Sequence, residues 1–406
     1  MTGPELHEIA AARRLLDGVA VRTPLEESRW LSRSAGGPVY FKAENLQRAG
    51  SFKIRGAYVR MSRLSAEERA AGVVAASAGN HAQGVALAAQ LLGIRAVVYM
   101  PRGAPIPKVN ATRAYGAEVR FEGDTVDQAL QSARTYAEES GAVLVHPFDH
   151  PDIVLGQATC GAEILEQCPD VRTIVVPTGG GGLLAGIAAA VKPSRPDVHV
   201  VGVQAEGAAA YPGSLRAGRP TAVDTMATMA DGIAIGRPGD VPFGTILQLV
   251  DGVVTVSEDR LSWSLLMLLE RAKLVVEPAG AAGVAAVLDR ADGIGGEQFE
   301  TPAVVVLSGG NIDPLLLLNV IRHGMATSGR YLACSVRIPD RPGGLAALLA
   351  TIAESGANVI DLTHERTAAY LHIGEVEVAL QLETKGAQHA EEVLRHLRSS
   401  GYEVRE

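Results

Sequence analysis

Regular alternation between short β-rich runs and helical runs is the feature that most limits the folds open to this chain. From Gly72 onward GVVAAS, RAVVYMP, AEVRF and AVLVHPF have the composition of strands, and helical patterns separate them. Asp124 is the expected N-cap of the last of these helices. Strands that alternate with helices form βαβ crossovers, which place the strands parallel in one sheet. Residues 72–148 therefore predict one compact α/β lobe.

A second α/β set follows, and the pattern then changes near the end of the chain. RTIVVP, VHVVGVQAE and PAVVVL are the expected strands of the second set, and the small, polar stretch 324–330 predicts a linker. After it the order is strand, helix, strand, strand, helix, strand, which is the ferredoxin-like βαββαβ arrangement. We expect a catalytic domain over residues 1–325, with the 72–148 lobe inserted in a larger lobe, and a small domain over 330–406.

Charge and composition exclude several classes of protein. The chain has 406 residues and a formal net charge of -8, which argues against a surface for nucleic acid or anionic membrane. Its three cysteines form no CxxC pair and indicate reduced thiols. The N-terminus lacks the apolar core of a signal peptide, and the uncharged run 173–191 is broken by Pro177 and four glycines. We expect a cytoplasmic protein.

A run of four glycines, in PTGGGGLLAG, separates an expected strand from an expected helix. Without Cβ atoms, a ligand can approach the backbone N–H groups of Gly179, Gly180, Gly181 and Gly182 directly. The helix that follows directs its positive dipole end at the same place. The loop therefore predicts a phosphate site.

The same glycines leave a second cofactor open. Gly180, Gly182 and Ala185 satisfy G-x-G-x-x-A, and the next strand ends at Glu206, the spacing of a dinucleotide-binding fingerprint. An NAD-dependent enzyme is thus an alternative. It leaves the segment around Lys53 and two further loops without a role.

Those two loops also follow expected strands, where open α/β sheets bind ligands. In SAGNHAQG, Ser77, Gly79 and Asn80 offer a hydroxyl, bare backbone and an amide, which suit a carboxylate or a ring hydroxyl. In LSGGN, Ser308 presents a hydroxyl at the end of another strand. Both loops predict ligand contacts at one rim.

Lys53 lies in AGSFKIRGAY, a stretch with the pattern of a buried helix start. One interpretation is structural, with Ser51 as N-cap and Lys53 and Arg55 solvated. The other is chemical, because burial lowers the pKa of a lysine and frees its lone pair for attack.

Five motifs in one order decide between these interpretations. S-F-K-I-R-G-A, S-A-G-N-H, G-G-G-G-L, E-P-A-G-A and S-G-G-N resemble the fold-type II pyridoxal-phosphate enzymes over about residues 5–325. The resemblance is strongest to threonine dehydratases (threonine ammonia-lyases) and their serine dehydratase and serine racemase relatives. D-R-P-G-G-L at 340–345 and G-A-N-V at 356–359 resemble an ACT domain. The chain thus resembles the medium-length threonine dehydratases, which implies an α/β fold of two parallel-sheet lobes followed by an ACT domain.

The resemblance also implies residue roles. Lys53 would bind pyridoxal 5′-phosphate covalently and act as general base, and Ser308 would contact the pyridine nitrogen. Threonine would give 2-oxobutanoate and ammonia; serine would give pyruvate, and hydroxyaspartate is a further candidate substrate. The implied cofactor-binding residues are Phe52, Lys53, Asn80, Gly179, Gly180, Gly181, Gly182, Leu183, Glu277 and Ser308, and the implied substrate-binding residues are Ser77, Ala78, Gly79, Asn80 and His81.

Two positions depart from relatives with other properties. Serine racemases resemble S-S-G-N-H at the second loop, where the second serine transfers a proton; Ala78 stands there, so racemisation should be poor. Relatives that bind a divalent cation have acidic residues near Glu206 to Pro212, and Pro212 occupies a position expected to be acidic. We therefore expect no metal.

The ACT resemblance implies an amino-acid effector, with isoleucine and valine as the candidates. It would bind at Arg341, Gly343, Gly344 and Leu345, with Asn358 as a partner, because the two glycines leave N–H groups free at a helix start. A domain that only dimerises and a sensor without catalysis are the alternatives. A homodimer or homotetramer is expected.

Overall fold

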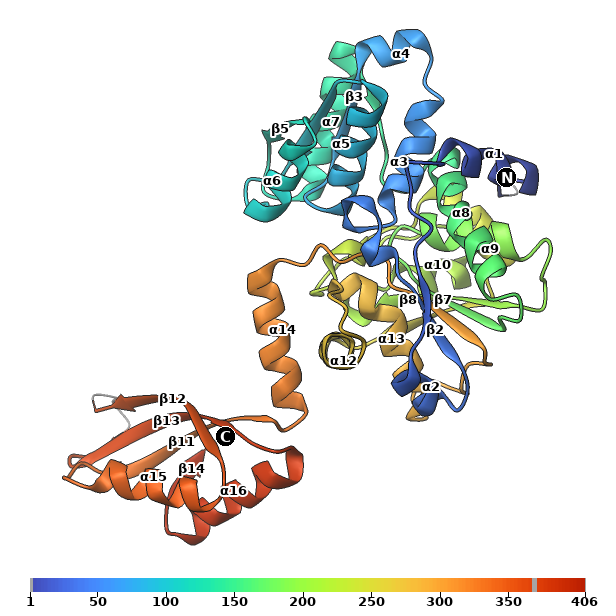
Figure 1. The fold of residues 1–406 in the computed structure, drawn as a ribbon. Helices are drawn as coiled ribbons and strands as arrows, with labels where there is room; N and C mark the ends of the chain where they lie inside the picture. The colour runs from blue at the N-terminus through green and yellow to red at the C-terminus, as the bar shows by residue number, and fades with distance from the viewer. Residues whose placement is uncertain (1–2, 367–370, 406) are drawn as a thin grey trace. The chain divides into compact units, whose positions relative to one another are not determined.

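A computed structural model describes residues 3–366 and 371–405. The chain forms two compact units, Met1–Pro314 and Leu315–Glu406 (Figure 1). Two β-sheets belong to the first unit and one to the second. The predicted α/β class with a separate C-terminal domain is confirmed.

The smaller sheet of the N-terminal unit lies in the lobe that was expected after Gly72. Its strands are all parallel and run in the order β5-β4-β3-β6. Their bounds are β3 Val73–Ala76, β4 Ala96–Met100, β5 Glu118–Phe121 and β6 Val143–Leu144, and the helices between them are α5 Asn80–Leu92, α6 Ile106–Ala114 and α7 Val126–Ser140. Each crossover is therefore helical, as the alternation predicted.

The N-cap of α7 differs from the expectation. Thr125, not Asp124, has the extended backbone of an N-cap, and its Oγ1 accepts the N–H of Gln128 at 3.3 Å. Asp124 is one residue too early to reach that amide, although Asp and Thr are both good N-caps. The prediction of Asp124 as the cap was wrong.

The larger sheet draws strands from both ends of the unit. Its order is β1-β2-β10-β7-β8-β9, and only the edge pair β1–β2 is antiparallel. The bounds are β1 Leu25–Glu27, β2 Val39–Lys42, β7 Thr173–Pro177, β8 His199–Ala205, β9 Gly252–Val256 and β10 Ala303–Val306. Because β2 precedes the small lobe in sequence and pairs with β10, the small lobe is an insertion in the large one.

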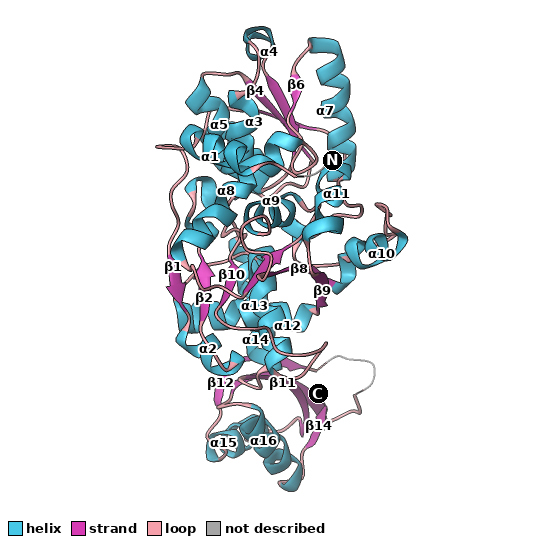
Figure 2. Ribbon diagram, turned by 90° about the vertical axis from the view of Figure 1, so that its right-hand side faces the viewer, coloured by secondary structure: helices cyan, strands magenta, loops and turns pink. Residues whose placement is uncertain are grey.

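Helices cover both faces of the larger sheet, as Figure 2 shows. α13 packs along β7, β8, β9 and β10, and α9 packs on β7 and β8 from the other side, with α8 and α11 outside it. The remaining bounds are α1 Leu6–Leu15, α2 Arg29–Ala35, α3 Lys53–Ser62, α4 Ala66–Ala71, α8 Pro151–Gln167, α9 Gly182–Val191, α10 Ala210–Ala217, α11 Asp240–Leu249, α12 Glu258–Met267 and α13 Pro278–Ala291, with short turns η1 Glu44–Leu46, η2 Arg48–Gly50, η3 Glu206–Ala208, η4 Asp231–Ile233 and η5 Leu268–Ala272.

The C-terminal unit has the predicted βαββαβ order. Its antiparallel sheet runs β12-β13-β11-β14, and α15 and α16 bury one face of it over Val336, Val378 and Leu380. The bounds are α14 Pro314–Thr327, β11 Tyr331–Pro339, α15 Gly344–Glu354, β12 Asn358–Glu365, β13 Glu375–Glu383, α16 Ala387–Ser399 and β14 Glu403–Arg405.

The stretch 324–330, expected to be a linker, is partly helical. Residues up to Thr327 complete α14. The helix ends in a Schellman motif, because Gly329 has φ 65° and the amides of Gly329 and Arg330 donate to the carbonyls of Ala326 and Met325. Small polar residues are typical of a connection, but here the helix continues to Thr327 and ends at Gly329.

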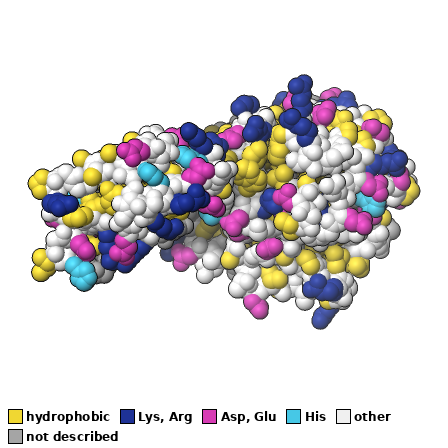
Figure 3. All heavy atoms as spheres, turned by 90° about the horizontal axis from the view of Figure 1, so that it is seen from below, with side chains coloured by type: hydrophobic (Ala, Val, Ile, Leu, Met, Phe, Trp, Pro, Cys, Tyr) yellow, Lys and Arg dark blue, Asp and Glu magenta, His cyan; other side chains and the backbone are white. Residues whose placement is uncertain are grey.

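Charged residues of both signs share the surface. On the face in Figure 3, Lys and Arg side chains are interspersed with Asp, Glu and hydrophobic side chains instead of gathering in one basic area. The net charge of the whole chain is -8. This mixed face offers no broad stripe of positive potential.

Candidate active site

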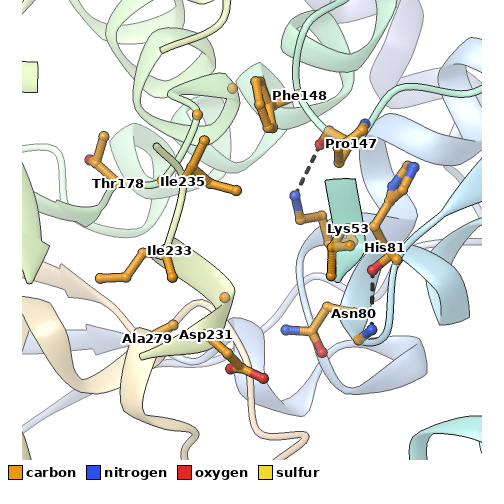
Figure 4. Close-up of a pocket in the computed structure, with 18 of the residues that line it drawn as sticks. Lys53, Asn80, His81, Pro147, Phe148, Thr178, Asp231, Ile233, Ile235 and Ala279 are labelled. Carbon is orange, nitrogen blue, oxygen red and sulfur yellow. Dashed lines mark hydrogen bonds between the residues drawn. The ribbon is translucent and has the colours of Figure 1, made fainter. Parts of the chain in front are cut away.

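One cavity of about 760 Å³ in the N-terminal unit reaches the carboxyl ends of β3 and β7 and Ser308, the second residue after β10. Strand ends of this kind are where open α/β sheets bind ligands. The structure brings all the cofactor and substrate residues predicted for this unit to its wall (Figure 4). They are Phe52, Lys53, Ser77, Ala78, Gly79, Asn80, His81, Gly179, Gly180, Gly181, Gly182, Leu183, Glu277 and Ser308.

Lys53 is the first residue of α3 and points into this cavity. Its Nζ donates to the carbonyl oxygen of Pro147 at 3.0 Å and lies 5.1 Å from the centre of the Phe52 ring. Burial lowers the pKa of Lys53 to about 8, although the nearby Glu277 carboxylate acts in the opposite direction. The amine is therefore partly neutral near neutral pH, as a nucleophile requires.

The four glycines form a cradle at the start of α9. Gly181 is its N-cap with φ 100°, and a Cβ on Gly180 would lie 2.3 Å from Cδ2 of Phe148. Within residues 3–366 and 371–405, no acceptor meets the backbone N–H groups of Gly179 to Leu183. Free amides at a helix N-terminus beside a cavity fit a phosphate. The cradle and the nearby lysine amine together fit pyridoxal 5′-phosphate.

Asn80 joins two of the predicted loops to the E-P-A-G-A segment. Its Nδ2 donates to Oε1 of Glu277 at 2.6 Å, and its Oδ1 accepts from Nδ2 of Asn311 at 2.8 Å. Burial raises the pKa of Glu277 to about 7, and Asp231 acts in the same direction. Asn311, whose role the sequence did not predict, thereby fixes the orientation of Asn80.

His81 lines the cavity but is committed to the protein interior. Its Nε2 lies 2.7 Å from the carbonyl oxygen of Val145. Burial, with a smaller contribution from Lys53, lowers the pKa of His81 to about 3. Because a carbonyl can only accept, Nε2 carries the proton of a neutral imidazole. His81 is thus suited to support the loop and not to act as a base near neutral pH.

Ser308 is buried and ties the loop after β10 to the lysine segment. Its carbonyl oxygen accepts the N–H of Phe52 at 3.2 Å, and Ser51 and Gly309 form an isolated β-bridge. In the second loop, Oγ of Ser77 accepts the N–H of Gly79 at 3.1 Å. The backbone next to Lys53 is therefore held by the loop that follows the last strand of the unit.

Arg55, two residues after the lysine, is buried and not solvated. It donates to both oxygens of Glu44 at 2.8 and 2.9 Å, and to both oxygens of Glu163 at 2.7 and 3.0 Å. Burial acts to raise the pKa of Glu44, but Arg55 outweighs it and holds that pKa below its ordinary value. Lys42 completes this buried charge cluster through Glu163. The structural interpretation of the segment, with Ser51 as N-cap, was wrong, since Phe52 occupies the N-cap.

Several lining residues carried no signal in the sequence. Phe148, Ile233 and Ile235 supply apolar walls, and Lys108 and Asp231 supply opposite charges. None belongs to a glycine loop or follows a strand directly. Only the fold brings them to the cavity.

In the C-terminal unit, the predicted effector residues are not all together. Arg341, Gly343, Gly344 and Leu345 lie in the loop after β11 and the first turn of α15, where Gly343 is the N-cap with φ 87°. Asn358 starts β12 and pairs with Glu383, whereas the last residue of β11 pairs with Glu375. Glu375 and Glu383 are the first and last residues of β13, so Asn358 and the loop lie at opposite ends of the sheet.

Residues 3–366 and 371–405 were also considered for metal sites and membrane-spanning helices, and neither is found among them. They contain no group of three or more His, Cys, Asp and Glu side chains placed to hold a metal ion, and Glu206 is exposed. No helix within residues 3–366 and 371–405 is both long and apolar enough to cross a membrane.

Comparisons with known proteins agree with this geometry. Residues 16–309 match the family "Pyridoxal-phosphate dependent enzyme", and residues 333–399 match the ACT domain. The L-threonine ammonia-lyase of Thermotoga maritima is 48% identical over 98% of both chains. That of Geobacter sulfurreducens is 47% identical over 94% of both. The processed form of threonine deaminase isoform 2 from Solanum lycopersicum has a TM-score of 0.73 and 36% identity over 79% of this chain and 95% of that one.

Proposed function

Because the chain belongs to the pyridoxal-phosphate dependent enzymes and carries an ACT domain, we propose that it deaminates L-threonine to 2-oxobutanoate and ammonia. The observation that carries the proposal is Lys53, a buried amine in one cavity with the glycine cradle and Ser308. The similarity to L-threonine ammonia-lyases over almost the whole chain supports the choice of substrate. Membership of this family argues against the NAD-dependent alternative, because the family uses pyridoxal phosphate.

Pyridoxal phosphate, when bound, supplies an electron sink for the bonds broken at the substrate. Gly179 to Leu183 would hold its phosphate, and Lys53 would hold it covalently. The Nζ atom of Lys53 would also be the base within this cavity that takes the proton from the substrate α-carbon. Loss of the β-hydroxyl as water, followed by hydrolysis, releases ammonia and the 2-oxo acid.

Ser308 would set the electronic character of this site. A hydroxyl next to the pyridine nitrogen cannot compel its protonation, whereas a carboxylate can. Negative charge at the α-carbon is then less well stabilised, which favours prompt elimination of the β-hydroxyl. The buried position of Ser308 on the cavity wall supports this role.

L-Serine is the second substrate that we propose, with pyruvate as its product. Serine carries the same leaving group as threonine but lacks its methyl group. The apolar walls of Phe148, Ile233 and Ile235 can bury that methyl group, so threonine should bind better than serine. Serine racemisation is the weaker candidate, because the methyl group of Ala78 cannot transfer a proton.

The ACT domain would bind an amino acid, with isoleucine or valine as the first candidates. Gly343 and Gly344 leave backbone N–H groups at the start of α15 for its carboxylate. Asn358 lies too far along the sheet to reach the same ligand within one chain. If both contact one effector, it binds between two copies, which fits a cytoplasmic homodimer or homotetramer.

The test uses the purified full-length protein. We expect visible cofactor absorbance, release of ammonia and 2-oxobutanoate from L-threonine, and, after borohydride reduction, label on the peptide that contains Lys53. Label on another lysine would overturn the site, and absence of ammonia release would overturn the activity. Calorimetry with isoleucine and valine then tests the effector, and Gly344→Val should abolish any binding outside the active site without loss of cofactor.

A further inference from the structure

One ion pair joins the two walls of the cavity. Lys108 belongs to α6 in the small lobe and Asp231 to η4 in the large lobe, and Nζ lies 2.7 Å from Oδ2. The Lys108 side chain is 11% exposed and that of Asp231 is 58% exposed. Figure 4 shows Asp231 on the wall opposite Asn80. A charge has thus been placed inside a ligand cavity, where none of the roles given above uses it.

The ammonium of Lys108 lies against the loop proposed to hold the substrate carboxylate. A Cβ built on Gly79 would stand 3.7 Å from Nζ of Lys108, and no other atom of the described residues lies within 4 Å of it, apart from Gly79 itself and its two chain neighbours. Lys108 and Asp231 also act on Glu277, lowering and raising its pKa respectively. Both charges are therefore close to the reacting region and not only to the cavity mouth.

The other cationic side chains on the cavity wall already have a role or an ion-pair partner. Lys53 is the amine that holds the cofactor, and Arg237 makes hydrogen bonds of 2.7 and 3.2 Å to the two oxygens of Asp240. Lys108 has three N–H donors, and Asp231 is its one acceptor among the described residues. Two donors of a nearly buried cation are thus left for a ligand.

We propose that Lys108 binds the α-carboxylate of the substrate, together with the Ser77 to Asn80 loop, and that Asp231 positions its ammonium. The inference rests on the proposed function, since it assigns a partner to that substrate. A purely structural ion pair is the competing explanation. Partly exposed pairs contribute little to stability, so joining the lobes is a weak reason for a charge at this place.

The test separates the carboxylate from the rest of the ligand. Holoenzyme is titrated with L-alanine, which has no β-leaving group, and with L-alaninamide, which has no carboxylate, and the change in cofactor absorbance gives each Kd. Lys108→Met should raise the Kd for L-alanine by about 10- to 100-fold, because a charge-assisted hydrogen bond is lost. It should raise the Kd for L-alaninamide by less than about twofold. Arg113→Met, on the same helix but outside the cavity, is the control and should change neither.

Asp231→Asn should raise the Kd for L-alanine by a smaller factor than Lys108→Met does, because the ammonium of Lys108 stays but is less well oriented. In steady state, Lys108→Met should raise KM for L-threonine far more than it lowers kcat. Two results would overturn the inference. If Lys108→Met lost equal affinity for L-alanine and L-alaninamide, the Lys108–Asp231 pair would be structural. If it lost affinity for neither, Lys108 would not contact the substrate. A wild-type protein without cofactor absorbance or ammonia release would instead refute the proposed function.

Discussion

The cavity around Lys53 and the buried charge cluster below α3 both remove a lysine from water, and they do so in opposite ways. In the cluster, Nζ of Lys42 donates to Glu163 at 2.6 Å, to Gln167 at 2.8 Å and to the carbonyl oxygen of Thr23 at 2.9 Å. In the cavity, Nζ of Lys53 has one acceptor among the described residues, the carbonyl oxygen of Pro147. One ammonium is completely paired, and the other is not.

This difference separates a structural charge from a reactive one. A buried charge that keeps all its hydrogen bonds and an opposite charge is held as an ion, and removing a partner is costly. A buried amine with one neutral acceptor loses the advantage of being charged, so its pKa falls, to about 8 for Lys53. The stable cluster keeps α3 in place, and the reactive amine projects from its first turn.

The largest effect is expected from Lys53→Ala. The variant should lose threonine deamination by about 10³-fold or more, because it lacks both the covalent attachment point and the base. Unfolding of the two apoproteins in urea should give free energies within about 1 kcal/mol of each other, since Lys53 borders a cavity and pairs with no carboxylate. Retention of a tenth of the wild-type activity would contradict the assignment of the amine.

Arg55→Met tests the other half of the comparison. Glu44 and Glu163 would be left buried without their main partner, which should lower the free energy of unfolding by about 3–5 kcal/mol. The matched control is Arg13→Met, because Arg13 pairs with Glu166 on the surface. That exposed pair should account for no more than about 1 kcal/mol. Similar losses in both variants would show that the buried cluster is not the stronger anchor.

A smaller effect is expected from pH in the incorporation of pyridoxal phosphate by apoprotein. The lysine reacts as the neutral amine, and its lowered pKa shifts the neutral form to lower pH. The rate should rise about tenfold per pH unit below pH 8 and level off above it. Stopped-flow absorbance between pH 6 and pH 10 measures this. A rate that keeps rising to pH 10 would mean that burial does not lower the pKa of Lys53.

Much of the fold could be predicted because it depends on local pattern. Alternating strand and helix patterns predicted the parallel sheet after Gly72 and the C-terminal βαββαβ order. The strands β1, β2 and β9 were not predicted, since they lie between segments with no regular alternation of strand and helix patterns. The end of α14 was missed because its last turn is as small and polar as a linker.

Site residues could be predicted from the sequence only where they lie in a recognisable local motif. Lys53, the glycine run and Ser308 lie in distinctive motifs, so their place on one cavity wall could be predicted from sequence, and their chemical roles stay predictions. Lys108 and Asp231 owe their roles to a contact between segments far apart in the chain, and nothing near either residue indicates it. Such long-range pairs require the fold.

The pairing of β2 with β10 determines when the larger sheet can be completed during translation. β2 is made early, yet its parallel neighbour is the last strand of the unit, so the larger sheet stays open until residues 303–306 leave the ribosome. The sheet of the small lobe has no such dependence, because β6 is the last of its four strands in the chain. The segment next to Lys53 is tethered to Ser308 by the amide of Phe52. A nascent chain therefore has no completed cofactor site until nearly the whole N-terminal unit has been translated.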